Sequence, residues 1–222
     1  MQDLQLLKVK KLITEYEQKY QRAPHAVTLL AVSKGQPVEK IEALFHAGQV
    51  LFGESYVQEA LPKIHALADK PIEWHFIGPI QSNKTRKIAE HFTWVHSVDA
   101  INIAKRLNDQ RPAHLPPLNI CLEVNINHET TKSGVLPEDV SSLATYCTAL
   151  PRLRLRGLMA IPAKQSTFTA QRETFHSLFL LWQSLRHQGF ALDTLSMGMS
   201  NDFEAAIAEG STLVRIGTAI FG

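Results

Sequence analysis

The chain has 222 residues, of which 45% are hydrophobic and 20% are charged. Its 23 Lys and Arg residues nearly balance its 21 Asp and Glu residues, so the net charge of +2 indicates neither a nucleic-acid nor a membrane partner. Two cysteines without a CxxC spacing argue against a disulfide framework and against a zinc site. The N-terminus lacks a signal-peptide pattern and no apolar run has the length of a membrane span, so we expect a soluble, cytoplasmic protein.

The first predicted element is a helix that begins near Asp3 and packs on a core. Its apolar residues recur at alternating spacings of three and four, and they are Leu6, Val9, Ile13, Tyr16 and Tyr20. From there strands and helices alternate to the end of the chain. Apolar runs bounded by Gly and Pro predict strands at residues 27–33, 49–53, 73–77, 93–98, 118–126, 152–161, 192–197 and 212–216.

The segments between these strands have helical patterns, and a Pro-rich linker at residues 111–117 interrupts the series. Asp99 is a plausible N-cap for the fourth of these helices. The predicted helices cover residues 37–47, 54–68, 82–91, 100–108, 137–150, 169–187 and 202–209.

Eight strands separated by helices predict an α/β fold, a single (β/α)8 TIM-type barrel with an additional N-terminal helix, in which residues 1–222 form one domain. An open, doubly wound sheet is the structural alternative. The sequence after the last strand is too short for a full closing helix, so we expect the N-terminal helix to take that place.

Lys34 follows the first apolar strand and precedes Gly35, at the end of a strand where a barrel binds its ligands. A lysine there can be a surface charge, a phosphate-binding cation or an amine nucleophile that forms a Schiff base with a carbonyl compound. The local run alone favours the surface charge, because lysine is rarely buried without a partner. The rest of the chain favours the nucleophile.

The loops after the last two strands suit a phosphate group. Ser200 offers a hydroxyl at the start of a helix, and Gly217 and Thr218 offer backbone N–H groups. The competing interpretation is that Ser200 or Asn201 caps the helix, with Glu204 completing a capping box. In a closed barrel the first strand adjoins the eighth, so Lys34 would lie beside this phosphate pocket. Composition leaves two phosphorylated aldehydes open, a phosphosugar and pyridoxal 5′-phosphate (PLP).

Motifs spread over essentially the whole chain narrow this choice. They are Ala-Val-Ser-Lys at 31–34, Phe-Gly-Glu-Ser-Tyr-Val-Gln-Glu at 52–59, His-Phe-Ile-Gly-Pro-Ile-Gln-Ser-Asn-Lys at 75–84, Lys-Ser-Gly at 132–134, Gly-Leu-Met at 157–159 with Ile-Pro at 161–162, Ser-Met-Gly-Met-Ser at 196–200 and Val-Arg-Ile-Gly-Thr at 214–218. In this order they resemble the PLP homeostasis protein family, which is similar to the N-terminal barrel of alanine racemase.

The resemblance implies a cytosolic PLP-binding protein without an established enzymatic reaction, with no catalytic residue and no metal. It implies that PLP is held as an internal aldimine on Lys34. It further implies that Ser200, Gly217 and Thr218 hold the phosphate, while Arg215 faces the pyridine nitrogen. The implied partners are PLP itself and apoenzymes that accept it, and we expect a monomer or a weak dimer.

The chain departs from the family pattern beside the expected cofactor ring. The family usually has Gly-Glu-Asn-Tyr where this chain has Ser55 in place of the asparagine, so a contact near the ring is shortened here. We expect Met199, which follows Gly198, to pack against the ring or the core. His75, His91 and His96 show no paired metal spacing, and we expect packing or surface roles for them.

Arg215 bears on the choice between a carrier and an enzyme. PLP stabilises carbanions best when its ring nitrogen is protonated, and a permanently charged guanidinium disfavours that proton. We therefore expect a carrier or buffer of PLP. The alternatives are a PLP-dependent amino-acid racemase-like enzyme with weak activity, a Schiff-base aldolase, and a scaffold that regulates a partner protein according to its PLP occupancy.

Overall fold

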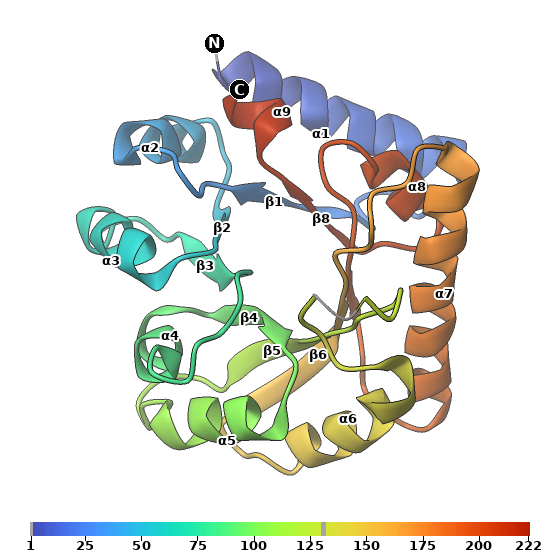
Figure 1. The fold of residues 1–222 in the computed structure, drawn as a ribbon. Helices are drawn as coiled ribbons and strands as arrows, with labels where there is room; N and C mark the ends of the chain where they lie inside the picture. The colour runs from blue at the N-terminus through green and yellow to red at the C-terminus, as the bar shows by residue number, and fades with distance from the viewer. Residues whose placement is uncertain (1, 130–131) are drawn as a thin grey trace.

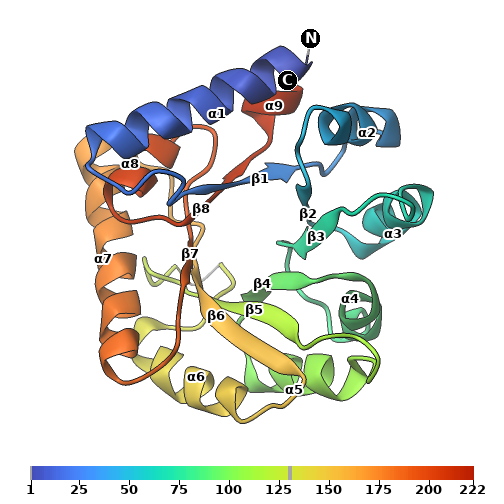
Figure 2. The same ribbon diagram turned by 180° about the vertical axis from the view of Figure 1, so that it is seen from behind.

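A closed barrel of eight parallel strands, each paired with its neighbours in chain order, forms the centre of the computed structural model, which describes residues 2–129 and 132–222 (Figures 1 and 2). The barrel closes where β8 pairs with β1, with Ala31 opposite Ile216. This confirms the predicted TIM-type fold. The strands are β1 Thr28–Val32, β2 Leu51–Glu54, β3 Glu73–Phe76, β4 Trp94–Val98, β5 Leu118–Glu123, β6 Leu153–Met159, β7 Thr194–Ser196 and β8 Leu213–Ile216.

Helices surround the barrel (Figure 1). They bury the outward-facing side chains of the strands. The main hydrophobic core therefore lies between the strands and the helices, as expected for parallel strands covered on the outside. The helices are α1 Gln2–Lys19, α2 Val38–His46, α3 Val57–Ala66, α4 Thr85–His91, α5 Ile101–Gln110, η1 Pro137–Asp139, α6 Val140–Thr148, α7 Phe168–His187, α8 Phe203–Ala208 and α9 Thr218–Phe221.

The N-terminal helix α1 lies against α8 and α9, and the two ends of the described chain are close together (Figure 1). Its predicted apolar stripe is confirmed, since Leu6, Val9 and Ile13 are all buried. The chain ends in the short helix α9, which the sequence pattern did not predict. The residues after β8 therefore form a helical turn and share the closing position with α1.

Two local predictions were wrong. Asp99 does not cap α5, because the N-cap position is Ala100 and no side chain bonds there. The predicted helix at 54–68 begins only at Val57, because Glu54 still belongs to β2 and Tyr56 has extended backbone dihedrals. Burial explains why the helix begins late, since the side chain of Glu54 is completely buried at the end of β2.

The interior of the barrel is polar to an unusual extent. Alternate residues of a strand point to opposite faces, and the inward positions of β3, β4, β7 and β8 carry His75, His96, Ser196 and Arg215. All four are buried and are connected by hydrogen bonds across the barrel. A small separate cluster of Trp94, Cys121 and Met159 supplies apolar contacts nearby.

Candidate functional site

Lys34 lies in the turn that follows β1, at the end of the barrel where the strands terminate, and its side chain is exposed. Gly35 after it has a φ of 72°, a left-handed conformation that glycine adopts without strain. The backbone N–H of Gly35 donates to a carboxylate oxygen of Glu59 on α3. The turn that carries Lys34 is therefore held by its neighbours while its amine stays accessible.

A buried ion pair that the sequence analysis missed supports this turn from behind. Lys63 Nζ lies 2.8 Å from Glu54 Oε1 and donates to the backbone carbonyl of Ser33 at 2.8 Å. Ser33 Oγ donates to the same Glu54 oxygen at 2.6 Å. Burial raises the pKa of Glu54, and the hydrogen bonds from Lys63 and Ser33 oppose this rise. The only signal in the sequence was the spacing of Glu59 and Lys63, which are one helical turn apart and also form an ion pair. Nothing in the sequence indicated Glu54 as the buried partner of Lys63.

The predicted phosphate loops do meet the end of β1. A methyl group added at Gly217 would lie 3.3 Å from the backbone oxygen of Val32, so the two loops are in close contact. The backbone N–H of Ala219, in the first turn of α9, donates to Ser200 Oγ at 3.4 Å. Ser200, Gly217 and Thr218 are thus neighbours at a helix start, where backbone N–H groups lack intrahelical partners. Such a group of donors suits an anion.

The capping alternative for the β7 loop is wrong. Asp202 occupies the N-cap of α8, and its Oδ1 accepts a hydrogen bond from the N–H of Met199 at 2.6 Å. Glu204 instead contacts α1, where Lys19 and Tyr20 both donate to its Oε1. Ser200 consequently does not cap α8, and its hydroxyl instead accepts from the first turn of α9.

Arg215 is buried at the inner end of the same region, with 3% of its surface exposed. Its Nη1 donates to Ser196 O and to Ser196 Oγ, both at 2.7 Å, and its Nη2 donates to Ala160 O at 2.9 Å. These bonds use three of the five guanidinium N–H groups. The other two have no acceptor among the described residues. Burial lowers the pKa of Arg215 to about 10.

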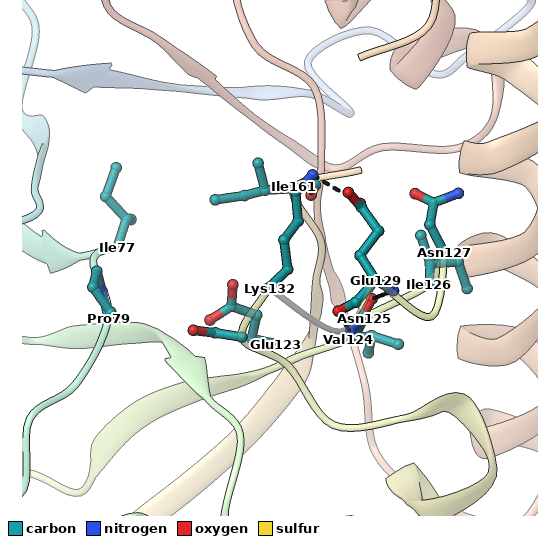
Figure 3. A pocket seen from close by; sticks show the side chains of 11 residues that line it. Ile77, Pro79, Glu123, Val124, Asn125, Ile126, Asn127, Glu129, Lys132 and Ile161 are labelled. Atoms are coloured by element: carbon teal, nitrogen blue, oxygen red, sulfur yellow. Dashed lines mark hydrogen bonds and ion pairs between the residues drawn. The ribbon is translucent and has the colours of Figure 1, made fainter. Parts of the chain in front are cut away.

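A cavity of about 190 Å³ opens at this end of the barrel, beyond β3, β5 and β6 (Figure 3). Glu123, Asn125 and Ile161 line it, and Lys132 forms a 2.9 Å ion pair with Glu129 at its rim. None of the predicted site residues is among the described residues that line this cavity. Ser55 lines a neighbouring cavity of about 250 Å³ together with Tyr56 and Lys84.

Glu123 has the most perturbed carboxyl group of this region. Its pKa is raised to about 7, first by burial and then by the Asp99 carboxylate, while Arg215 acts in the opposite direction. The sequence analysis did not single it out, because a glutamate at a strand end has no local signature of burial. The site therefore combines a buried cation with a carboxyl that changes charge near neutral pH.

Glu123→Gln is expected to change how stability depends on pH in the protein without ligand. The folded chain retains the Glu123 proton up to a pH of about 7, whereas the unfolded chain releases it near its usual 4.5, so stability falls as pH rises between these values. Glutamine removes this loss, and at about 1.4 kcal/mol per pKa unit the variant should gain up to about 3 kcal/mol near pH 8. Urea unfolding at about pH 5 and pH 8 measures the difference, and an equal gain at both values would contradict the assignment.

No helix within residues 2–129 and 132–222 has the length and apolarity needed to cross a membrane. Within the same residues, no group of three or more His, Cys, Asp or Glu side chains could hold a metal ion. His75 and His96, for which packing was expected, are buried and hydrogen-bonded to each other at 2.9 Å.

Known proteins resemble this chain along nearly its whole length. The family model described as "Alanine racemase, N-terminal domain" matches residues 8–222. A protein of Pseudomonas aeruginosa named pyridoxal phosphate homeostasis protein is 57% identical over 218 residues, which cover 98% of this chain and 93% of that protein. The protein of the same name from Escherichia coli K12 is 53% identical over 204 residues, covering 90% and 87%.

A solved structure extends the comparison to the cofactor. PipY from Synechococcus elongatus PCC7942, in a structure with PLP bound, is 36% identical to this chain and superposes with a TM-score of 0.84. The superposition covers 95% of this chain and all of that one. Fold, length and sequence are therefore similar along nearly the whole of both proteins.

Proposed function

This chain belongs to the alanine racemase N-terminal domain family and, within it, to the pyridoxal phosphate homeostasis proteins, and from this we propose that it binds PLP and takes part in intracellular PLP homeostasis. One observation of the structure carries the proposal. Closure of the barrel between β8 and β1 brings the end of β1, which precedes Lys34, next to Gly217, and Ser200 contacts the start of α9. An amine and a group of donors that suit a phosphate therefore lie at the same end of the barrel.

The donor set fits PLP group by group. Lys34 provides a primary amine for the aldehyde, and Ser200, Gly217 and Thr218 provide hydroxyl and backbone donors for the phosphate. Arg215 has two N–H groups left for a ring nitrogen that acts as an acceptor. A glutamate or aspartate in that position would instead favour a protonated ring.

Ser55 and Met199 complete the proposed site at its edges. Ser55 lies at the end of β2, and its backbone packs so closely on Gly78 that an added methyl group there would lie 2.0 Å from Ser55 O. Met199 follows β7 and is half-buried beside Ser200. We assign Ser55 to the ring side of the cofactor and Met199 to an apolar contact with it.

The same residues favour holding the cofactor over using it. Bound PLP would supply an electron sink for reactions of amino acids, and this sink is strongest with a protonated ring nitrogen. Arg215 is a donor and cannot share a proton with that nitrogen, so it keeps the ring neutral. The chain would thus act as a reservoir that keeps a reactive aldehyde bound and delivers it to apoenzymes that need it.

A binding and transfer experiment tests this function. Purified protein is titrated with PLP, and binding is followed by visible absorption. The loaded protein is then mixed with a PLP-dependent apoenzyme whose recovered activity reports delivery. We expect saturable binding with one PLP per chain, delivery to the apoenzyme, and no racemisation of amino acids by the loaded protein. Absence of binding would refute the function, and rapid racemisation would make the protein an enzyme.

A further inference from the structure

A continuous chain of polar side chains crosses the inside of the barrel. It begins at Arg215 on β8, whose Nη1 lies 2.7 Å from Ser196 Oγ on β7. Ser196 Oγ lies 2.9 Å from His96 Nδ1 on β4. His96 Nε2 lies 2.9 Å from His75 Nδ1 on β3, and His75 Nε2 lies 3.0 Å from a carboxylate oxygen of Glu73.

The ionised Glu73 carboxylate and two neutral imidazole rings together give every hydrogen bond in this chain one direction. Arg215 can only donate, so Ser196 Oγ accepts from it, and with a neutral His96 whose Nδ1 accepts, the Ser196 hydroxyl donates to that nitrogen. His96 then carries its proton on Nε2 and donates to His75 Nδ1. His75 in turn donates from Nε2 to the Glu73 carboxylate, which can only accept when it is ionised. Burial favours neutral histidines here, and neutral rings in this arrangement hold their protons on Nε2.

The surroundings of the two histidines support this neutral state. Both rings are buried, and the ring of His75 stacks on Trp94 at 5.3 Å with an angle of 6° between the planes. Burial lowers the pKa of both histidines, and the positive charge of Arg215 contributes to the lowering at His96. The hydrogen bond from His75 lowers the pKa of Glu73, which favours the ionised acceptor.

The chain also connects opposite ends of the barrel. Arg215 lies near the end that carries Lys34, whereas Glu73 begins β3 and lines a cavity of about 420 Å³ at the other end. Arg215 has no ion-pair partner among the described residues, although it is almost completely buried. The carboxylates of Asp202 and Glu123 favour its charged form from outside ion-pair distance, and its hydrogen bonds to Ser196 and Ala160 hold the guanidinium in place.

We propose that Glu73, His75, His96 and Ser196 are positioning residues that fix the orientation of the Arg215 guanidinium, and through it the two donors offered to the ring of a bound cofactor. The part that concerns the cofactor rests on the proposed function. The hydrogen-bonded chain itself does not, because it exists in the protein without ligand. Each residue acts through the next, and only Arg215 would touch PLP.

The first experiment examines the chain without PLP. In protein labelled with ¹⁵N at histidine, NMR should show His75 and His96 as neutral rings protonated on Nε2, unchanged between about pH 6 and pH 8. Glu73→Gln should shift the resonances of both rings, because it removes the charged acceptor at the end of the chain. Glu39→Gln, on the exposed face of α2, is the matched control and should shift neither. Protonated rings, or protons on Nδ1, would overturn the proposal.

The second experiment measures the effect on the cofactor. Ser196→Ala removes one acceptor of Arg215 and the donor to His96, and we expect roughly tenfold weaker PLP binding, from the loss of one hydrogen bond to a charged group. The pH dependence of the PLP absorption spectrum should shift in the same variant. Ser196→Thr keeps the hydroxyl and should restore both.

The outcomes separate this inference from the proposed function. If wild-type protein binds no PLP but shows the expected histidine resonances, the function is wrong and the hydrogen-bonded chain stands. If PLP binds with equal affinity and an unchanged spectrum in wild type and Ser196→Ala, the positioning role is wrong and the function stands. Circular dichroism shows whether Ser196→Ala folds. If it does not, the absorption spectrum of PLP bound to Glu73→Gln, which changes the more exposed end of the hydrogen-bonded chain, tests the positioning role instead.

Discussion

Lys34→Ala is expected to abolish covalent retention of PLP. When wild-type protein is mixed with PLP and treated with borohydride, the label should remain on the chain after denaturation and map to the peptide that contains Lys34. The alanine variant should retain none, because the exposed amine is gone. Weak, reversible binding through Ser200 and the start of α9 should persist, since the residues proposed to hold the phosphate are intact.

A lysine at the same end of the barrel provides the control. Lys132 lies at the rim of the neighbouring cavity in an ion pair with Glu129, and Lys132→Ala should retain the label on Lys34 as wild type does. Mass spectrometry of the digested, reduced protein measures both variants. If Lys34→Ala retained as much label as wild type, Lys34 would not be the nucleophile and would be a surface charge or a phosphate-binding cation.

Lys63→Met is expected to lower the free energy of unfolding by about 3–5 kcal/mol, which is the effect of removing one member of a buried ion pair. The side chain of Lys63 is 6% exposed and that of Glu54 is 0% exposed, so the remaining carboxylate would have no access to water. Glu54 Oε2 already lacks a hydrogen-bond partner among the described residues. Urea unfolding near pH 8 measures the loss.

The pH dependence identifies the cause of this loss. Burial already raises the pKa of Glu54, and without Lys63 only the hydrogen bond from Ser33 opposes that rise, so the carboxyl of the variant takes up a proton as pH falls. The deficit should therefore shrink toward about pH 5. A Glu54→Gln/Lys63→Met double variant should recover part of the stability at pH 8, because no charge stays buried.

An exposed ion pair is the matched control for this variant. Lys11 and Glu15 are 77% and 51% exposed, and Lys11→Met should change stability by less than about 1 kcal/mol. A deficit in Lys63→Met that matches this small change, or one independent of pH, would show that the buried pair does not support the Lys34 turn as described.

The order of the elements was readable from the sequence because it depends on local patterns. Runs of apolar residues bounded by Gly and Pro mark strands wherever both faces are buried, and all eight predicted strands exist in the barrel. Their ends were less well predicted, as the strand expected at 192–197 is observed at Thr194–Ser196. Strand ends depend on which backbone groups find partners, and those partners belong to other strands.

Lys34, Ser200, Gly217 and Thr218 were proposed from the sequence, because strand ends and glycine-containing loops have local signatures and recur in a recognisable family, and their roles toward a cofactor stay predictions. The Glu54–Lys63 pair, Glu123 and the polar chain through the barrel had no such signature and could not be predicted. His75, His96 and Ser196 come from strands far apart in sequence, and each resembles an ordinary polar residue within its own strand.

The sequence by itself thus determined the alternation of strands and helices, the barrel and the amine at the end of its first strand. Closure between β1 and β8 decided that the end of β1, which precedes this amine, lies beside Gly217, and the inward register of β3, β4, β7 and β8 decided that Glu73, His75, His96, Ser196 and Arg215 form one chain. The physical reason is that a side-chain pattern indicates which residues of one segment are buried. A hydrogen bond across the barrel depends on how two segments are placed relative to each other.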